Sequence, residues 1–140
     1  MNDDVYQAQV MALSKDESRA GTLAAPTASA TVDNALCGDR VRIDLTVEGG
    51  RIADVRHRVR GCVLCKASAA ALAAAVVGRA TDDVAAAQTA VTKMLKEKAP
   101  APAAPWTAYA AFTPVADYKS RHTCVLLPFE AAIKALETYR

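Results

Sequence analysis

The chain has 140 residues, 52% of them hydrophobic and 23% charged, and its formal net charge at pH 7 is +2. This length and composition predict a single soluble domain over residues 1–140 rather than a disordered chain. The small net charge gives no reason to expect nucleic acid as a partner, and no apolar run approaches the roughly 20 residues of a membrane span. Because the N-terminus lacks an apolar segment, we predict no secretory signal and expect a cytoplasmic protein.

The N-terminal half is predicted to hold one helix followed by a β-hairpin. Apolar residues recur at helical spacing over 5–18, whereas small and polar residues over 22–34 predict a loop. Apolar and polar residues alternate over 40–47 and again over 51–60, which is the pattern of half-buried strands. Glycines at the intervening turn indicate that these two strands pair as a hairpin.

The two faces of this hairpin differ in charge. His57 falls on the apolar face, where we expect a hydrogen-bonded core histidine rather than a metal ligand. The opposite face carries a row of arginines, namely Arg40, Arg42, Arg56, Arg58 and Arg60. Such a row can dock an acidic partner, or it can keep a solvated sheet face from aggregating, and the pattern leaves both interpretations open.

The C-terminal half is predicted to be helical apart from one linker. The alanine-rich stretches 67–77 and 81–96 predict two helices, and the Pro/Ala stretch 99–105 predicts an extended linker. A last helix is predicted to begin with Thr113 as its N-cap and Pro114 as its first residue, and to continue to the C-terminus.

Three residues after the linker bear on packing and on the backbone. Trp106 and Tyr109 are expected to be core anchors. Pro128 has no N–H to donate to the carbonyl four residues earlier, so we expect a kink or a helix start there, at Cys124. Since the strands come early and the helices late, the sequence predicts an α+β fold, in which helices cover one face of a small antiparallel sheet.

Three of the four cysteines lie at predicted junctions between elements. Cys37 precedes the hairpin, Cys62 follows it, and Cys124 lies near a helix start. Because a hairpin returns to the edge where it began, we expect Cys37 and Cys62 to lie close together, with Asp39 beside them. Thiolates with one carboxylate suit a tetrahedral zinc site or an iron–sulfur site. The alternative is that these residues are buried structural cysteines.

Three motifs around the hairpin resemble those of a known family. They are Cys37-Gly-Asp39, Gly61-Cys62-x-x-Cys-x-Ala-Ser68 and Arg121-x-x-Cys124. They are similar to the motifs of the IscU/NifU N-terminal family of iron–sulfur cluster assembly scaffolds, and most similar to those of its SufU branch. The wide spacing between the second and third motif cysteines, and the arginine before the third, carry the likeness to that branch. The resemblance implies a small antiparallel sheet covered by helices, as predicted above.

The resemblance also implies ligands, cargo and partners. Cys37, Asp39, Cys62 and Cys124 would bind a transient iron–sulfur cluster of the 2Fe–2S type, or zinc. Cys37 would accept persulfide sulfur from a cysteine desulfurase, and Arg121 at the rim would attract an anionic persulfide or a partner. Apo forms of iron–sulfur proteins would receive the finished cluster.

Two residues and one motif depart from the family pattern. Cys65 stands where relatives carry a small or apolar residue, so it is either a small buried residue or an additional ligand. Isc-type scaffolds have a histidine directly before the last cysteine, but here Thr123 occupies that place and His122 lies one residue earlier. His122 is therefore either an occasional ligand or base, or a surface residue. The Leu-Pro-Pro-Val-Lys motif that docks a chaperone in those scaffolds is not intact here.

The sequence therefore predicts a scaffold for iron–sulfur cluster assembly, which is a sulfur carrier rather than a conventional enzyme. One alternative is a zinc-dependent sulfurtransferase partner of the desulfurase, which accepts persulfide and builds no cluster. A second alternative is a zinc-stabilised interaction module without sulfur transfer. Persulfide formation and cluster assembly distinguish these three functions.

Overall fold

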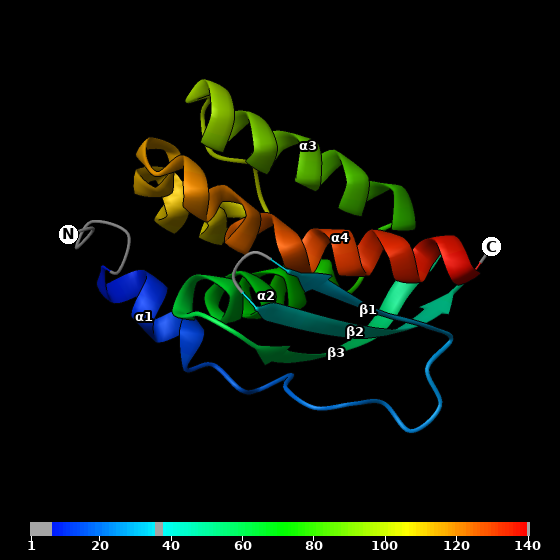
Figure 1. Cartoon of the computed structure of the whole chain (residues 1–140). Helices are drawn as coiled ribbons and strands as arrows, with labels where there is room; N and C mark the ends of the chain where they lie inside the picture. The colour runs from blue at the N-terminus through cyan, green and yellow to red at the C-terminus, as the bar shows by residue number, and fades with distance from the viewer. Residues whose placement is uncertain (1–6, 36–37, 140) are drawn as a thin grey trace.

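The structure, a computed structural model, describes residues 7–35 and 38–139 of the chain. Its strands form one antiparallel sheet in the order β1-β2-β3 (Figure 1). They are β1 (Ala28–Asn34), β2 (Asp39–Glu48) and β3 (Arg51–Arg60). The predicted hairpin is present, and it pairs Arg40 with Arg60 at its open end and Glu48 with Arg51 at its turn.

The helices lie on one face of the sheet (Figure 1). They are α1 (Ala8–Ser14), α2 (Val63–Val76), α3 (Thr81–Glu97), α4 (His122–Tyr139) and the 3₁₀ helices η2 (Thr107–Asp117) and η3 (Lys119–Arg121). Helix α4 packs on β1 and β2, and α2 packs on β3 and on α4. Helix α3 packs on α4 and η2, while α1 packs against α2. The predicted α+β class, with helices on one face of an antiparallel sheet, is confirmed.

Strand β1 corrects the prediction of a loop over 22–34. Its sequence alternates small apolar residues with polar ones: Ala28 is buried, Ala30 and Val32 are half-buried, and Thr31 and Asp33 between and after them are exposed. The alternation is the normal strand signal. It was missed because alanine and serine carry little β propensity of their own, so that pairing with β2 decides the conformation.

The segment before β1 is ordered by a buried carboxylate on the outer face of the sheet. Asp44 accepts hydrogen bonds from the backbone N–H of Leu23 at 3.0 Å and from the Ser29 hydroxyl at 2.6 Å. It also pairs with Arg42 at 2.8 Å. Burial acts to raise the pKa of Asp44, but the hydrogen bonds from Arg42, Ser29 and Leu23 hold this pKa below its usual value.

Two helices differ in length from the prediction. Helix α1 ends at Ser14 rather than at residue 18, because the Asp16 carboxylate accepts hydrogen bonds from the N–H and hydroxyl of Ser18 and stabilises a turn instead. Residues 5 and 6 of the predicted helix lie outside the described residues. Helix α2 begins at Val63, earlier than the predicted residue 67, so that Cys62 is its N-cap residue.

The prediction of one helix from Thr113 to the C-terminus is wrong. The 3₁₀ helix η2 already contains Thr113 and Pro114, and the Thr113 hydroxyl donates back to the carbonyl of Ala110 at 2.7 Å instead of capping a new helix. Helix α4 begins at His122. Cys124 therefore lies in the first turn of a helix, as the position of Pro128 predicted.

Aromatic residues join η2 to α4 in the core. Trp106 and Tyr109 are buried, as predicted, and both rings contact Phe129, with centroids 5.9 and 5.1 Å apart. Burial raises the pKa of Tyr109.

Within residues 7–35 and 38–139, no helix combines the length and the apolar character that crossing a bilayer requires.

His57 is buried on the inner face of the sheet, as expected, but it is not fully hydrogen-bonded. Its Nε2 atom has no hydrogen-bond partner among the described residues. Burial lowers the pKa of His57, although the nearby carboxylates of Asp16 and Glu17 act in the opposite direction. The histidine is therefore held as the neutral form more strongly than in water.

Candidate metal centre

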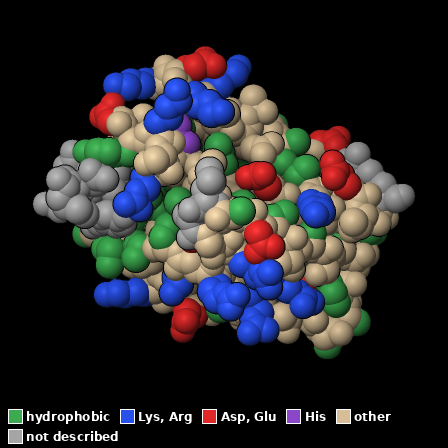
Figure 2. Space-filling model, in the orientation of Figure 1, with side chains coloured by type: hydrophobic (Ala, Val, Ile, Leu, Met, Phe, Trp, Pro, Cys, Tyr) green, Lys and Arg blue, Asp and Glu red, His purple; other side chains and the backbone are tan. Residues whose placement is uncertain are grey.

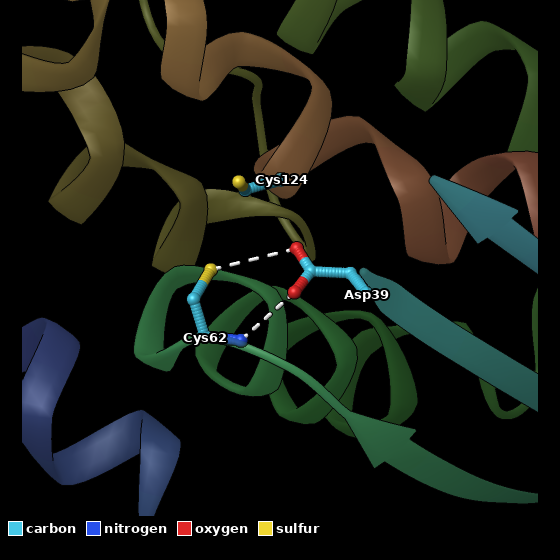
Figure 3. Close-up of side chains that lie close together, drawn as sticks. All are labelled: Asp39, Cys62 and Cys124. Atoms are coloured by element: carbon cyan, nitrogen blue, oxygen red, sulfur yellow. Dashed lines mark hydrogen bonds between the residues drawn. The ribbon is translucent and has the colours of Figure 1, made fainter. Parts of the chain in front are cut away.

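Asp39, Cys62 and Cys124 meet at one end of the sheet (Figure 3). Asp39 is the first residue of β2, Cys62 lies between β3 and α2, and Cys124 lies in the first turn of α4. A carboxylate oxygen and the two Sγ atoms all lie within 4.8 Å of one another. Ligands of one zinc ion lie roughly 2.0–2.3 Å from the metal, so these donors are near the separation that a shared ion requires.

The Asp39 carboxylate is held against Cys62 by both of its oxygen atoms (Figure 3). The backbone N–H of Cys62 donates to Oδ1 at 3.0 Å, and the Cys62 thiol lies 3.6 Å from Oδ2. Asp39 is only 2% exposed. Its position next to a thiol, rather than in solvent, is that of a ligand or of a group that orients one.

Gly61 makes this close approach possible. A Cβ at position 61 would overlap the carboxylate of Asp39. In the sequence this glycine is a part of the family motif, and the room that it leaves for Asp39 is visible only in three dimensions. The glycine therefore determines where the carboxylate lies.

Cys62 has the electrostatic environment of a reactive thiol. Its pKa is lowered to about 7, mainly by a hydrogen bond with Cys124 and against the effect of burial. The backbone N–H groups of Cys65 and Leu64, at the start of α2, lower this pKa further, whereas the charge of Asp39 raises it. A larger fraction of Cys62 than of an ordinary cysteine is therefore thiolate at neutral pH, and the thiolate is the form that binds metals and attacks sulfur.

Cys124 is buried, and the elements around it fix its position. The neighbouring His122 is also buried, which corrects the surface alternative, and its Nε2 lies 3.1 Å from the carbonyl oxygens of Val115 and Ala116. This contact attaches the start of α4 to the end of η2. His122 does not belong to the group of clustered donors among the described residues.

A second contact from α2 holds the same turn of α4. The Ser68 hydroxyl donates to the carbonyl of Val125 at 2.6 Å, and the Tyr109 hydroxyl donates to the Ser68 carbonyl at 2.8 Å. Ser68 and Tyr109 are fully buried. This role was not predicted from the sequence, where its signal is a single serine within an alanine-rich stretch.

The other predicted residues fall into three cases. Cys37 lies outside the described residues. Cys65 is fully buried on the first turn of α2 and belongs to the hydrophobic core, in agreement with the interpretation as a small buried residue. Arg121 is half-buried at the end of η3, next to the first turn of α4, and its role at the rim stays a prediction.

Comparison with known proteins identifies the family. The NifU-like N terminal domain family matches residues 5–125. The chain belongs to this family. A NifU-like protein (N-terminal) from Brucella abortus has a crystal structure that covers 98% of this chain, with 95% of its own length aligned, at 37% sequence identity and a TM-score of 0.93. The predicted resemblance is confirmed.

Two further proteins are similar to this NifU-like chain over different lengths. One is a SUF-system protein from thermophilic Fervidobacterium Islandicum AW-1, which is proposed as an iron–sulfur cluster assembly scaffold. It is 23% identical, and the alignment covers 94% of this chain and 96% of that protein with a TM-score of 0.87. This likeness shows the shared fold. The bifunctional protein NifU/MnmA of Rubrobacter xylanophilus is 43% identical over 61 residues. That match spans 43% of this chain and only 12% of the bifunctional protein.

Proposed function

We propose that this NifU-like chain is a scaffold on which iron–sulfur clusters are assembled, with residues 1–140 working as one domain. The observation that carries the proposal is the clustering of Asp39, Cys62 and Cys124, whose donor atoms lie within 4.8 Å of one another. Membership of the NifU-like family supports it. Cys37, outside the described residues, is proposed as the fourth ligand because it completes the family motif with Asp39.

Sulfur enters the proposed cycle through a cysteine desulfurase. The Cys37 thiolate attacks the outer sulfur of the persulfide on that enzyme, the sulfur–sulfur bond breaks, and the enzyme's cysteine leaves as a thiolate. A persulfide is then present on Cys37. The positive charge of Arg121 favours the approach of the anionic persulfide. Iron and the cluster are cargo in this scheme, and apo iron–sulfur proteins receive the product.

The chemistry of the donors suits cargo that must leave. Cys62 is half-buried while Asp39 and Cys124 are buried, so the cargo would be reached from the side of Cys62. A carboxylate is a harder ligand than a thiolate and binds iron–sulfur centres less firmly. The described cysteines Cys62, Cys65 and Cys124 form no disulfide with one another, which fits the proposed location in the reducing cytoplasm.

Anaerobic reconstitution tests the proposal. The purified protein is incubated with cysteine, iron and a cysteine desulfurase, and its iron, zinc and acid-labile sulfide are measured. We expect iron and sulfide in equal amounts, lost in Cys37→Ala and retained in the matched control Cys65→Ala. Assembly that survives Cys37→Ala, or that never occurs in the wild type, contradicts the proposal.

A zinc-dependent sulfurtransferase is the second candidate, and the same donor set favours it. One carboxylate and two thiolates within 4.8 Å are suitable ligands for a tetrahedral zinc ion. In this case the protein would contain about one zinc ion per chain, would accept a persulfide and stimulate the desulfurase, and would carry no sulfide. Persulfide detection by mass spectrometry on the same sample separates the two candidates.

A further inference from the structure

The outer face of the sheet, which no helix covers among the described residues, contains a hollow lined by arginines. We call it the arginine hollow, and it has a volume of about 370 Å³. Its lining residues are Thr31, Arg40, Arg42, Arg58, Val59 and Arg60. Figure 2 shows Lys and Arg side chains gathered in the lower part of the view, beside the strands.

The register of the sheet places like charges directly opposite each other in this hollow. Arg40 faces Arg60, and Arg42 faces Arg58, as direct partners on β2 and β3. Like charges in such positions destabilise a sheet. Solvation of the outer face alone does not explain two successive arginine pairs, because side chains of mixed charge would solvate the face without this repulsion.

Only half of these arginines are neutralised within the fold. Arg40 pairs with Asp33 at 2.7 Å, and Arg42 pairs with Asp44 at 2.8 Å. Arg58 and Arg60 are exposed, and neither has an acidic side chain within 4 Å among the described residues. Neither guanidinium group is therefore held in an ion pair among the described residues, although the charge of Asp33, which pairs with Arg40, also acts on Arg60 at longer range.

The hollow begins at the same end of the sheet as the candidate metal centre. Arg40 directly follows Asp39, and Arg60 directly precedes Gly61 and Cys62. Because side chains alternate along a strand, the arginines point to the outer face while Asp39 points to the inner face. A protein bound in the hollow would thus lie beside the edge from which the thiols are reached.

We propose that the arginine hollow is a docking site for an acidic surface of the protein that delivers sulfur to the neighbouring thiols. The inference rests on the proposed function for the identity of that partner. Neighbouring arginine pairs on the two strands are about 7 Å apart along the strand. Acidic side chains one helical turn apart, at roughly 6 Å, match this spacing and would neutralise the unpaired guanidinium groups.

Other occupants fit the hollow less well. Among the described residues no aromatic side chain lines it, so bases of a single-stranded nucleic acid would find no stacking platform there. The arginines form two successive cross-strand residue pairs on β2 and β3, and so many positive charges along the strands suit an extended acidic partner better than one small oxyanion such as phosphate. An acidic protein surface needs no aromatic stacking platform, and its carboxylates are spread out as the arginines are.

The first experiment maps binding on the full chain without a desulfurase. NMR spectra of ¹⁵N-labelled protein are followed during titration with poly-L-glutamate, with a poly-dT oligonucleotide and with inorganic pyrophosphate. We expect poly-L-glutamate to shift the signals of Arg40, Arg42, Arg58 and Arg60, and added salt to reverse the shifts. Tighter binding of the oligonucleotide or pyrophosphate at these residues, or shifts confined to another face, overturns the proposal.

The second experiment measures desulfurase kinetics with the double variant Arg58→Gln/Arg60→Gln. We expect the KM for this chain to rise about three- to tenfold, from the loss of two exposed ion pairs, with kcat unchanged. Lys93→Gln/Lys96→Gln is the matched control, because it removes the same charge from exposed positions on α3, which packs on α4. A KM equal to that of the wild type overturns the proposal.

The two experiments separate failure of the docking site from failure of the proposed function. If the wild type does not stimulate the desulfurase, the proposed sulfur delivery fails and the assignment of the partner fails with it. The NMR experiment then still decides whether the hollow binds acidic polypeptides. The melting temperature of Arg58→Gln/Arg60→Gln should be no lower than that of the wild type, because the substitutions relieve repulsion.

Discussion

The carboxylate of Asp39 occupies the space that a side chain on Gly61 would need. In this position Asp39 accepts a hydrogen bond from the backbone N–H of Cys62 at 3.0 Å. The glycine has no donor atom on a side chain and cannot bind a metal itself. It nevertheless decides whether a carboxylate lies next to the two thiols.

Gly61→Ala should therefore weaken metal binding without removing any ligand. The new methyl group displaces the Asp39 carboxylate, and we expect zinc affinity to fall by about 10- to 100-fold, as for other groups that orient ligands. The crowding should also lower the free energy of unfolding by about 1–3 kcal/mol. Zinc affinity is measured by competition with a chromophoric chelator, and stability by urea unfolding of the metal-free protein.

A double-mutant cycle identifies the cause of this effect. In the background of Asp39→Ala the carboxylate is gone, so adding Gly61→Ala should cost little further stability. If the glycine substitution costs as much in that background as in the wild type, the contact with Asp39 is not its reason.

Cys62 should be the most readily alkylated of the described cysteines. Its pKa of about 7 means that the thiolate fraction rises through neutral pH. We expect its rate of reaction with iodoacetamide, in metal-free reduced protein, to increase with a midpoint near that value. Peptide mass spectrometry measures the rate at each cysteine, and fully buried Cys65 serves as the internal reference.

The hydrogen bond from Cys124 should account for much of this lowered pKa. Cys124→Ala removes the donor and should move the midpoint of Cys62 alkylation to higher pH. Cys124→Ser retains a hydroxyl donor and should move the midpoint less. An unchanged midpoint in Cys124→Ala would show that another group sets the pKa of Cys62.

Ser68→Ala should destabilise the fold through one buried hydrogen bond. The substitution leaves the Val125 carbonyl without the donor that lies 2.6 Å away and removes a neighbour of the Tyr109 hydroxyl. We expect a loss of about 1–3 kcal/mol in the free energy of unfolding. Thr89→Ala, which removes an exposed hydroxyl bonded to the Ala85 carbonyl, is the control and should change stability by less than about 0.5 kcal/mol.

His57 should make the fold less stable in acid. Its pKa is lowered from the ordinary value of 6.5, so the unfolded chain binds a proton more readily than the folded one. Stability is therefore complete above pH 6.5 and decreases as the pH falls from there toward the lowered pKa. Urea unfolding at pH 7.5 and 5 (about one unit or more on either side of that value) should show a smaller loss for His57→Phe than for the wild type. Equal losses would contradict this role.

The hairpin, and the meeting of Asp39 with Cys62 at its open end, could be predicted from sequence because local pattern determines both. Alternation over β2 and β3 defines which side chains face inward, and a hairpin must bring its two ends together. Asp39 and Cys62 therefore had to meet. Cys124 could be added only through the family motif, since nothing local indicates that α4 packs on β1 and β2.

The features that escaped prediction depend on tertiary contacts. Strand β1 consists of residues with weak β preference and exists because β2 offers a free edge. The extended 3₁₀ helix η2 is held by buried Tyr109 and Phe112 rather than by helix propensity. For His122 the sequence left open an occasional ligand or base and a surface residue, and only the packing of η2 on α4 shows that it is buried.

The donors of the candidate metal centre come from β2, α2 and α4, which are far apart along the chain. A cargo bound by all of them would act as a reversible cross-link between these three elements, present only while they are folded together. Ligand that binds only the native state stabilises it by mass action. Loading should thus tighten the entire fold, and delivery of the cargo should return the protein to a looser state in which the next exchange of ligands is easier.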